Sequence, residues 1–423
     1  MTVIPMWATF RPVDLRAGSR SAELPLLSVS QYRGVVPRSE LDDAEPRAAD
    51  LGIYKTCRPG DLVLNRMSAY KGAVGVASVA GLVSPDYLVM RATDLASPKF
   101  LVYLIKTSWF VGQITKLLRG IGSSDGSNVR TPRIGLDELG SIKVDIPERD
   151  SQDDIVDFLD RETAEIDAFI ADQEELIGLL IERRAATITH AVTRGLDPSA
   201  PMKDSGIEWL GEVPAHWAVG RIGSSVASTK NGVWGDEPGS DDDIRCVRVA
   251  DFDRPLQRVH DRAVTYRAIT TSEREGRVLR KGDLLLEKSG GGEKSPVGFV
   301  VLYDRDEPAV TSNFVARVQL RTGMDPHYWT YVHGSNYGRR LTARSVKQST
   351  GIQNLDQSSY FSEAAPLPPS GEQSLIADYL DHETAEIDAT IADAREAIAL
   401  SKERRAALIS AAVTGKIDVR GLA

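Results

Sequence analysis

Two long stretches of the chain carry a heptad-like spacing of apolar residues, and the first of them is residues 155–197. Its apolar side chains recur mostly at steps of three, four or seven positions, which places them along one stripe of a helix. No proline interrupts the stretch, acidic residues open it and arginines close it, as suits the two ends of a helix. We therefore predict a helix of about 40 residues, roughly 60 Å long. The stripe consists of Ile155, Leu159, Ile166, Ile170, Ile177, Leu180, Ile181 and Ile188.

The second stretch is a copy of the first. Residues 376–418 repeat residues 155–197 at an offset of 221, with 27 of 43 positions identical. A helix this long cannot bury its stripe alone, and the nearest available stripe is that of its duplicate. We predict that the two helices pair as an antiparallel coiled coil. Two alternatives stay open: each helix joins a separate bundle, or each pairs with another chain.

The remaining segments are rich in predicted strands. Short β-branched and apolar runs alternate with Gly, Pro and Asp turns, and RPGDLVLN at 58–65 is echoed by RKGDLLLE at 280–287. One helix is expected in each segment, over about 98–118 and about 325–346. The fold class is therefore α+β: two similar β-rich α/β domains separated by two long helices, with a pseudo-two-fold repeat. The predicted boundaries are 1–147 for domain 1, 148–197 for helix 1, 198–367 for domain 2 and 368–423 for helix 2.

Charge is segregated along the chain. The formal net charge is −9, but the four segments carry +4, −9, 0 and −4 in chain order. The acidic residues in excess lie in the two helices, so the domains remain open to a nucleic acid, which requires only a local basic surface. No stretch is apolar enough to cross a membrane and no signal pattern opens the chain, so cytoplasmic localisation is expected.

Catalytic motifs are missing from the sequence. The only Pro-Pro pair, Pro368-Pro369, follows a leucine, whereas an adenine methyltransferase carries Asn or Asp before such a pair and an aromatic residue after it. There is no Glu-x-Lys of a restriction nuclease and no glycine-rich phosphate loop, and no histidine or cysteine has metal-ligand spacing. These observations favour a non-catalytic protein with no catalytic residues, no metal and no cofactor of its own.

The chain resembles the specificity subunits of type I restriction-modification systems. The resemblance rests on the duplicated LD-x-ETAEIDA-x-IA…ERRAA-x-I helix, the closing VTGKID at 413–418 and the linker KDSGIEWLGEVPAHW at 203–217. LNRMSAYKGAVG in the first domain also fits, and together these motifs cover the whole chain. The first domain lacks such a linker, which suggests a shortened start, and Trp7 is expected where the second domain has Trp217.

The resemblance implies a non-enzymatic role. Each domain would be a target recognition domain that reads one half of a bipartite site in double-stranded DNA. The paired helices would set the gap between the half-sites and dock two methyltransferase subunits, which restriction and translocase subunits would join. S-adenosylmethionine, ATP and magnesium are then expected on the partner subunits.

Candidate DNA contacts form two groups, because Arg and Lys suit phosphate or guanine and Gln and Asn suit adenine. The first group is a basic helix followed by a polar loop in domain 2 and its counterpart in domain 1. It comprises Arg339, Arg340, Arg344, Lys347, Gln348, Thr350, Gln353 and Asn354, with Lys116, Arg119, Asn128, Arg130 and Arg133. The second group lies in the loops 65–71 and 287–294 and comprises Arg66, Lys71, Lys288 and Lys294.

Three other interpretations remain open at this stage. The basic loops could be ordinary solvated surface. The chain could be a structural coiled-coil scaffold without sequence-specific DNA binding, which would explain the helices but not the two echoing domains. It could also be a nuclease fused to its own recognition module, although the residues for that chemistry are missing.

Overall fold

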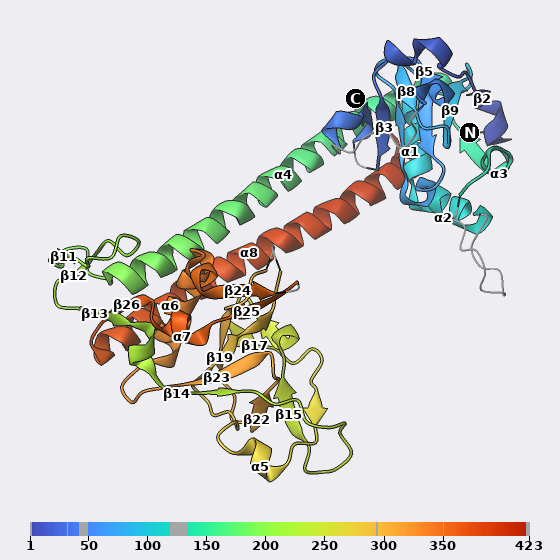
Figure 1. The fold of residues 1–423 in the computed structure, drawn as a ribbon. Helices are drawn as coiled ribbons and strands as arrows, with labels where there is room; N and C mark the ends of the chain where they lie inside the picture. The colour runs from blue at the N-terminus through green and yellow to red at the C-terminus, as the bar shows by residue number, and fades with distance from the viewer. Residues whose placement is uncertain are drawn as a thin grey trace. The chain divides into compact units, whose positions relative to one another are not determined.

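The computed structural model describes residues 2–31, 33–41, 50–118, 133–292, 295–349 and 351–419. The chain divides into two compact units (Figure 1). Unit 1 is Met1–Glu174 with Ala394–Ala423, and unit 2 is Glu175–Asp393. Each unit therefore holds one β-rich domain together with one part of each long helix. Among the described residues, none of the helices has the length and apolar character needed to span a membrane.

The two long helices are α4 (Arg149–Arg194, 46 residues) and α8 (Ser370–Val413, 44 residues). Their starts are built alike: the Gln152 side chain donates to the Pro147 carbonyl at 2.9 Å, and the Gln373 side chain donates to the Pro368 carbonyl at 3.0 Å. A glycine with positive φ follows the end of each long helix, Gly195 after α4 and Gly415 after α8. This is a common way to end a helix. The two predicted long helices are confirmed.

The pairing of these helices is antiparallel within each unit. In unit 1, Arg405 of α8 lies 2.9 Å from Asp167 of α4, and Lys402 of α8 lies 4.0 Å from Glu174 of α4. Residue numbers therefore rise along α4 in the direction in which they fall along α8. In unit 2, Arg184 of α4 lies 3.0 Å from Asp388 of α8. The predicted antiparallel coiled coil is confirmed. One member of the predicted stripe is wrong, because Ile181 is 51% exposed.

The domain of unit 1 is built on a four-stranded sheet of order β2-β9-β6-β7. Three further two-stranded pairs surround it, and short helices connect the strands. The sheet strands are β2 (Phe10–Val13), β9 (Tyr87–Ala92), β6 (Leu62–Asn65) and β7 (Val74–Val76). The pairs are β1 (Thr2–Pro5) with β10 (Lys143–Ile146), β3 (Leu27–Ser30) with β4 (Gly34–Pro37), and β5 (Lys55–Cys57) with β8 (Gly81–Val83). The helices are α1 (Pro98–Lys106), α2 (Ser108–Leu117) and α3 (Leu136–Ser141), with 3-10 turns η1 (Met6–Ala8) and η5 (Ala69–Lys71).

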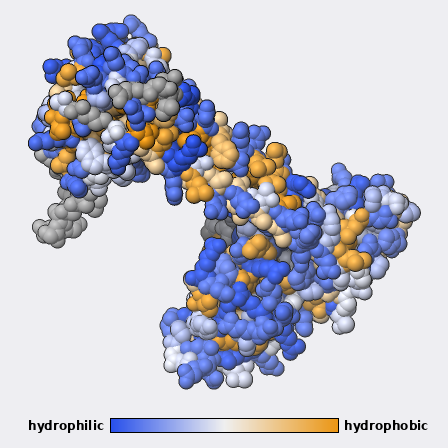
Figure 2. Space-filling view, turned by 180° about the vertical axis from the view of Figure 1, so that it is seen from behind, coloured by the Kyte–Doolittle hydropathy of each residue, from blue (hydrophilic) through white to orange (hydrophobic). Residues whose placement is uncertain are grey.

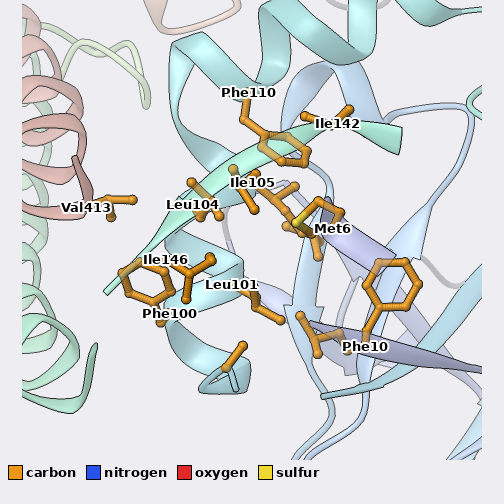
Figure 3. Close-up of a cluster of buried hydrophobic side chains, with 14 of the residues drawn as sticks. Met6, Phe10, Phe100, Leu101, Leu104, Ile105, Phe110, Ile142, Ile146 and Val413 are labelled. Carbon is orange, nitrogen blue, oxygen red and sulfur yellow. The ribbon is translucent and has the colours of Figure 1, made fainter. Parts of the chain in front are cut away.

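The core of unit 1 joins this domain to the long helices. Figure 3 shows Phe100, Leu101 and Leu104 of α1 in the same cluster as Met6, with Val413 of α8 at its edge. Phe100 and Met6 have no exposed surface, and Val413 is 1% exposed. Burial of such side chains removes apolar surface from water and stabilises the fold, so the domain and its part of the helix pair form one packed body.

The domain of unit 2 has a six-stranded sheet of order β14-β23-β19-β21-β17-β16. Its first four strands repeat the unit 1 order, with β14, β23, β19 and β21 in the places of β2, β9, β6 and β7. The sheet strands are β14 (Val226–Asn231), β23 (Val315–Leu320), β19 (Asp283–Glu287), β21 (Val300–Tyr303), β17 (Arg258–Val259) and β16 (Phe252–Asp253). The others are β11 (Met202–Asp204), β12 (Glu212–Pro214), β13 (Ala218–Arg221), β15 (Ile244–Val247), β18 (Tyr266–Arg267), β20 (Ser289–Gly290), β22 (Ala309–Thr311), β24 (Val346–Ser349), β25 (Ile352–Leu355) and β26 (Ala364–Leu367). The helices are α5 (Thr271–Arg274), α6 (Pro326–Gly338) and α7 (Gln357–Phe361), with 3-10 turns η6 (Ile222–Ser225) and η8 (Leu341–Ser345).

The Gly-Asp turns that recur in the two domains have the same structural role in both. Asp61, at the start of β6, accepts from Arg91 of β9 at 2.8 Å. Asp283, at the start of β19, accepts from Arg317 of β23 at 2.7 Å. Both aspartates are buried, and a buried carboxylate requires such a partner. The faint sequence echo therefore marks a repeated, paired carboxylate.

Two expected helices are shorter than predicted. The helix over 98–118 is broken at Thr107, whose backbone is extended and whose hydroxyl accepts from the Phe110 amide, so that a new helix begins there. The helix over 325–346 ends at Gly338, and Arg340 then adopts a φ of 58°. A left-handed residue cannot continue a right-handed helix.

The start of the chain does not repeat the second linker in the predicted way. Thr2 pairs with Ile146 as Ala218 pairs with Leu367, so the place of Trp217 falls one residue before Thr2. The expectation that Trp7 takes that place is wrong, because Trp7 corresponds to Gly223. Trp7 lies against Gly140, whereas Gly223 lies against Phe361, so the two repeats exchange the large and the small residue.

Candidate nucleic-acid interface

In unit 2, the two predicted loop groups meet in one small sheet. Strand β20 follows the Lys288 loop segment, and it pairs with β25, which pairs in turn with β24. The register places Ser289 opposite Asn354 and Asn354 opposite Lys347. The segment expected to be a polar loop is therefore largely a β-hairpin. Residues far apart in the sequence become neighbours on one surface.

The two faces of this sheet differ. Asn354 and Lys347 are exposed and directly opposite each other, which puts them on the same face. The Ser289 hydroxyl donates to the Asn354 side-chain oxygen at 2.7 Å, and Lys347 donates to Asp356 at 2.7 Å. This ammonium, together with a backbone amide, lowers the pKa of Asp356. The outer face thus presents an oriented amide beside a lysine, the groups that read adenine and contact phosphate.

Gln353 points the other way. It is 9% exposed, and its side-chain oxygen accepts from the Val297 amide at 3.2 Å. Since strand neighbours alternate between faces, the exposure of Asn354 requires the burial of Gln353. The structure therefore places the Gln353 side chain inside the hairpin, away from the exposed face that carries Asn354.

The arginines of domain 2 follow α6 instead of lying on a longer helix, contrary to the expectation. Arg339 is the C-cap of α6; its guanidinium stacks 4.9 Å from the centre of the Trp209 ring and donates to the Trp209 carbonyl. Burial lowers the pKa of Arg339, and it is held against the linker. Arg340 and Arg344 are exposed, and Arg344 lies 3.8 Å from Glu363. Arg340 and Arg344 are therefore more accessible to a phosphate than Arg339.

A buried ion pair supports the strand that leads to Lys288. Glu287 is 1% exposed and lies 2.8 Å from Arg254, whose guanidinium stacks 4.7 Å from the centre of the Phe299 ring. Burial raises the pKa of Glu287, and the charge of Arg254 opposes that rise. This pair anchors the end of β19 while Lys288, next in the chain, is half-buried at the margin of the small sheet.

In unit 1, the described candidates also converge. The Arg66 side chain donates to the Ile134 carbonyl at 2.7 Å, and the Ile134 amide donates back to Arg66, which brings the 65–71 loop beside exposed Arg133. Turn η5, which ends at Lys71, packs against α2, which carries exposed Lys116. Arg119, Asn128, Arg130, Lys294 and Thr350 lie outside the described residues, and the side chain of Gln348 is likewise not described.

The residues that hold each domain on its helix are not among the predicted candidates. We call each group, an aspartate of the long helix with its partners in the domain, a seat. Asp160 of α4 accepts from Lys99 at 2.6 Å and from the Tyr103 hydroxyl at 2.7 Å. Asp381 of α8 lies 2.9 Å from the His327 ring nitrogen and accepts from the Tyr331 hydroxyl at 2.7 Å. A signal existed, because both aspartates belong to the identical LD-x-ETAEIDA segment of the repeat.

The described side chains include no cluster of three or more His, Cys, Asp or Glu residues that could hold a metal ion. The two cysteines are buried, and burial raises the pKa of both thiols to about 11. Such thiols are not activated as nucleophiles. What the arrangement offers is two basic and polar surfaces, one on each domain.

Comparison with known proteins agrees with the resemblance found in the sequence. No family model matches the chain. The chain is 22% identical to the type I restriction enzyme StySPI specificity subunit of Salmonella potsdam, over 75% of this chain and 66% of the relative. It is 28% identical to the EcoBI specificity subunit of Escherichia coli, over 26% of this chain and 23% of the relative. The match thus spans just under two thirds of the first relative.

Solved structures share the fold. The HsdS subunit of Thermoanaerobacter tengcongensis matches with a TM-score of 0.51 and 16% identity, over 98% of this chain and 97% of that chain. A chain from a study of complex assembly and conformational transition of the type I R-M system matches with a TM-score of 0.63 and 16% identity, over 97% of both chains. The predicted resemblance to type I specificity subunits and the predicted fold class are confirmed.

Proposed function

We propose that this chain is the DNA-reading specificity subunit of a type I restriction-modification complex. Each domain reads one half of a bipartite site in double-stranded DNA, and the helix pair docks two methyltransferase subunits, which restriction and translocase subunits join. The chain itself is non-catalytic. S-adenosylmethionine, ATP and magnesium are bound by the partner subunits.

One observation carries the proposal: the two domains share a scaffold and differ at the candidate surface. The same strand order, the same buried Asp–Arg pair and the same aspartate seat occur twice. The candidate segments 116–133 and 339–354 are unlike in sequence. A duplicated scaffold with divergent polar loops suits a reader of two different half-sites, because base choice depends on a few loop side chains.

A second feature supports the docking of two partners. Leu179 of α4 and Leu400 of α8 occupy equivalent positions in the repeat and are 57% and 58% exposed. Hydrophobic side chains are exposed over the long helices in the space-filling view (Figure 2). An exposed apolar residue repeated at equivalent positions suits one copy of the same partner on each repeat.

Methylome sequencing tests the proposal. The chain is expressed with the methyltransferase subunit of its own system in a host without other methylation, and methylated adenines are mapped. We expect a bipartite motif with an unspecified gap, and no methyl transfer by the purified chain alone. Replacing residues 1–147 with those of a relative should change one half of the motif only. A motif that changes in both halves, or methylation by the chain alone, would contradict the proposal.

A further inference from the structure

The seats of the two domains share their main hydrogen bonds but differ in the cation that contacts the aspartate. In unit 1, the Ser97 amide donates to the Gln152 side-chain oxygen at 2.7 Å; in unit 2, the Asp325 amide donates to Gln373 at 3.1 Å. Tyr103 contacts Thr163 at 3.3 Å, and Tyr331 contacts Thr384 at 3.2 Å. Each tyrosine donates to the seat aspartate at 2.7 Å.

The exception is the cation. Lys99 donates to Asp160 at 2.6 Å, and at the equivalent position His327 lies 2.9 Å from Asp381. A lysine remains charged throughout the physiological range, whereas a histidine changes charge within it. The two seats are therefore built alike but respond differently to pH.

We propose that Asp160 and Asp381 are positioning residues that hold each recognition domain on its helix, and that reading of the second half-site alone weakens when His327 loses its charge. The DNA part of this proposal rests on the function proposed above. The seating part can be measured without DNA.

The surroundings of His327 support this assignment. The hydrogen bond to Asp381 raises the pKa of His327, burial opposes the rise, and the nearby Arg258 also opposes it while Asp325 at the start of α6 favours it. Arg258 is itself paired with Asp304 at 2.7 Å. Burial alone would raise the pKa of Asp381, but the hydrogen bonds from His327 and Tyr331 outweigh burial and lower the pKa.

Solvent reaches the seat of unit 2. A pocket of about 360 Å³ is lined by His327, Asp381 and Arg258, with Arg184 and Asp388 at the helix pair. His327 remains 36% exposed at its side chain. Because His327 has a raised pKa in the folded chain, its stabilising charge is fully present below about pH 6.5 and is lost as the pH rises through that raised value.

Amide hydrogen exchange of the assembled complex tests the seating. Exchange in α1 and α6 is measured from pH 6 to pH 9 and corrected for intrinsic rates. We expect protection of α6 to fall about three- to tenfold as the pH rises, while α1 changes little, since a charge-assisted hydrogen bond is lost only in α6. The H327K variant should abolish this dependence, and Lys99 shows that a lysine fits this seat.

The reciprocal variant is the matched control. K99H should give α1 a pH dependence like that of α6, which keeps its own, and D381N should weaken protection of α6 at every pH. If protection of α6 does not change with pH in the parent chain, or still changes in H327K, the seating part is wrong.

DNA binding by the same complex tests the positioning role once methylome sequencing has given the half-sites. Discrimination is the ratio of Kd for a mismatched half-site to Kd for the matched one. For the second half-site it should fall several-fold between pH 6 and pH 9 in the parent complex and stay constant in H327K. If hydrogen exchange of α6 changes with pH but the discrimination ratio stays constant, the seat has only a structural role. Absence of sequence preference at any pH would overturn the proposed function, and with it the positioning role, while leaving the exchange result intact.

Discussion

Arg184 and Asp388 form a bidentate ion pair between the two long helices in unit 2, with Nε 3.0 Å from Oδ1 and Nη2 3.2 Å from Oδ2. The repeat places Arg405 and Asp167 in the same relationship in unit 1. The two pairs differ in burial: the side chains of Arg184 and Asp388 are 18% and 23% exposed, against 31% and 54% for Arg405 and Asp167. Arg184 also donates to the Pro255 carbonyl at 2.9 Å, which ties a loop of the domain to the helices.

This asymmetry predicts unequal costs for matched substitutions. R184A should lower the free energy of unfolding by about 1–3 kcal/mol, because it leaves a partly buried carboxylate and a carbonyl unpaired. R405A should cost less than about 1 kcal/mol, as exposed pairs do. Urea unfolding of the two variants and the parent chain measures the difference. Equal costs would show that burial does not separate the two pairs.

Asn354 and Gln353 should respond differently to alanine, although they are neighbours. N354A should leave stability nearly unchanged and relax discrimination at one position of the second half-site by about 1–3 kcal/mol. Q353A should lower the free energy of unfolding by about 1–3 kcal/mol, since the buried Val297 amide loses its acceptor. Binding to single-base variants of the site and urea unfolding distinguish the two. The assignment fails if Q353A relaxes base choice without loss of stability.

His333 should make unit 2 less stable in acid. His333 is only 1% exposed, and one of its ring nitrogens lies 2.7 Å from the Tyr360 hydroxyl. Burial lowers its pKa to about 4, below the value of about 6.5 expected in the unfolded chain. Its contribution is therefore complete above pH 6.5 and is lost as the pH falls towards 4, by about 2 kcal/mol at pH 5. The measurement is the free energy of unfolding against pH for the parent and H333Q, in which this part of the slope should vanish. An unchanged slope would contradict the assignment.

Leu179 and Leu400 should each affect one bound methyltransferase. L179E and L400E are surface changes and should leave unfolding nearly unchanged. Each should reduce the stoichiometry from two methyltransferases to one, and the double variant should bind none, as measured by the mass of the purified complex. E175Q provides a control, because Glu175 is exposed on the same helix as Leu179. Full stoichiometry in the double variant would exclude this surface as the docking site.

Lengthening both helices by one heptad should widen the gap in the methylated motif. Seven residues inserted after Glu175 of α4 and seven after the equivalent Glu396 of α8 add about 10 Å of helix, close to three base pairs at about 3.4 Å each. A heptad keeps the apolar stripe in register. Insertion into α4 alone is the control; it should disrupt pairing and lower stability. A double insertion that stays active with an unchanged gap would show that the partners set the spacing.

The sequence by itself determined the architecture of this protein. The heptad stripe and the 27 identities between the two copies predicted both long helices and their antiparallel pairing, because a long amphipathic helix must bury its stripe and its duplicate offers a matching one. The echo of RPGDLVLN in RKGDLLLE marked two copies of one sheet. These signals are local periodicity and self-similarity, which a single sequence contains in full.

Only the tertiary structure decided which side chains face outward at the candidate surface and which hold the domains in place. Asn354 and Gln353 look equally suited to a base, and the strand pleat alone separates them. The predicted helix over 325–346 instead ends at Gly338, because Arg340 is left-handed and the pairing of β24 with β25, which outweighs local helix propensity, holds the chain extended from Val346. Asp160 contacts Lys99, and Asp381 contacts His327, although the members of each pair lie more than 50 residues apart in the sequence. Such contacts depend on the packing of distant segments, which residue spacing does not reveal.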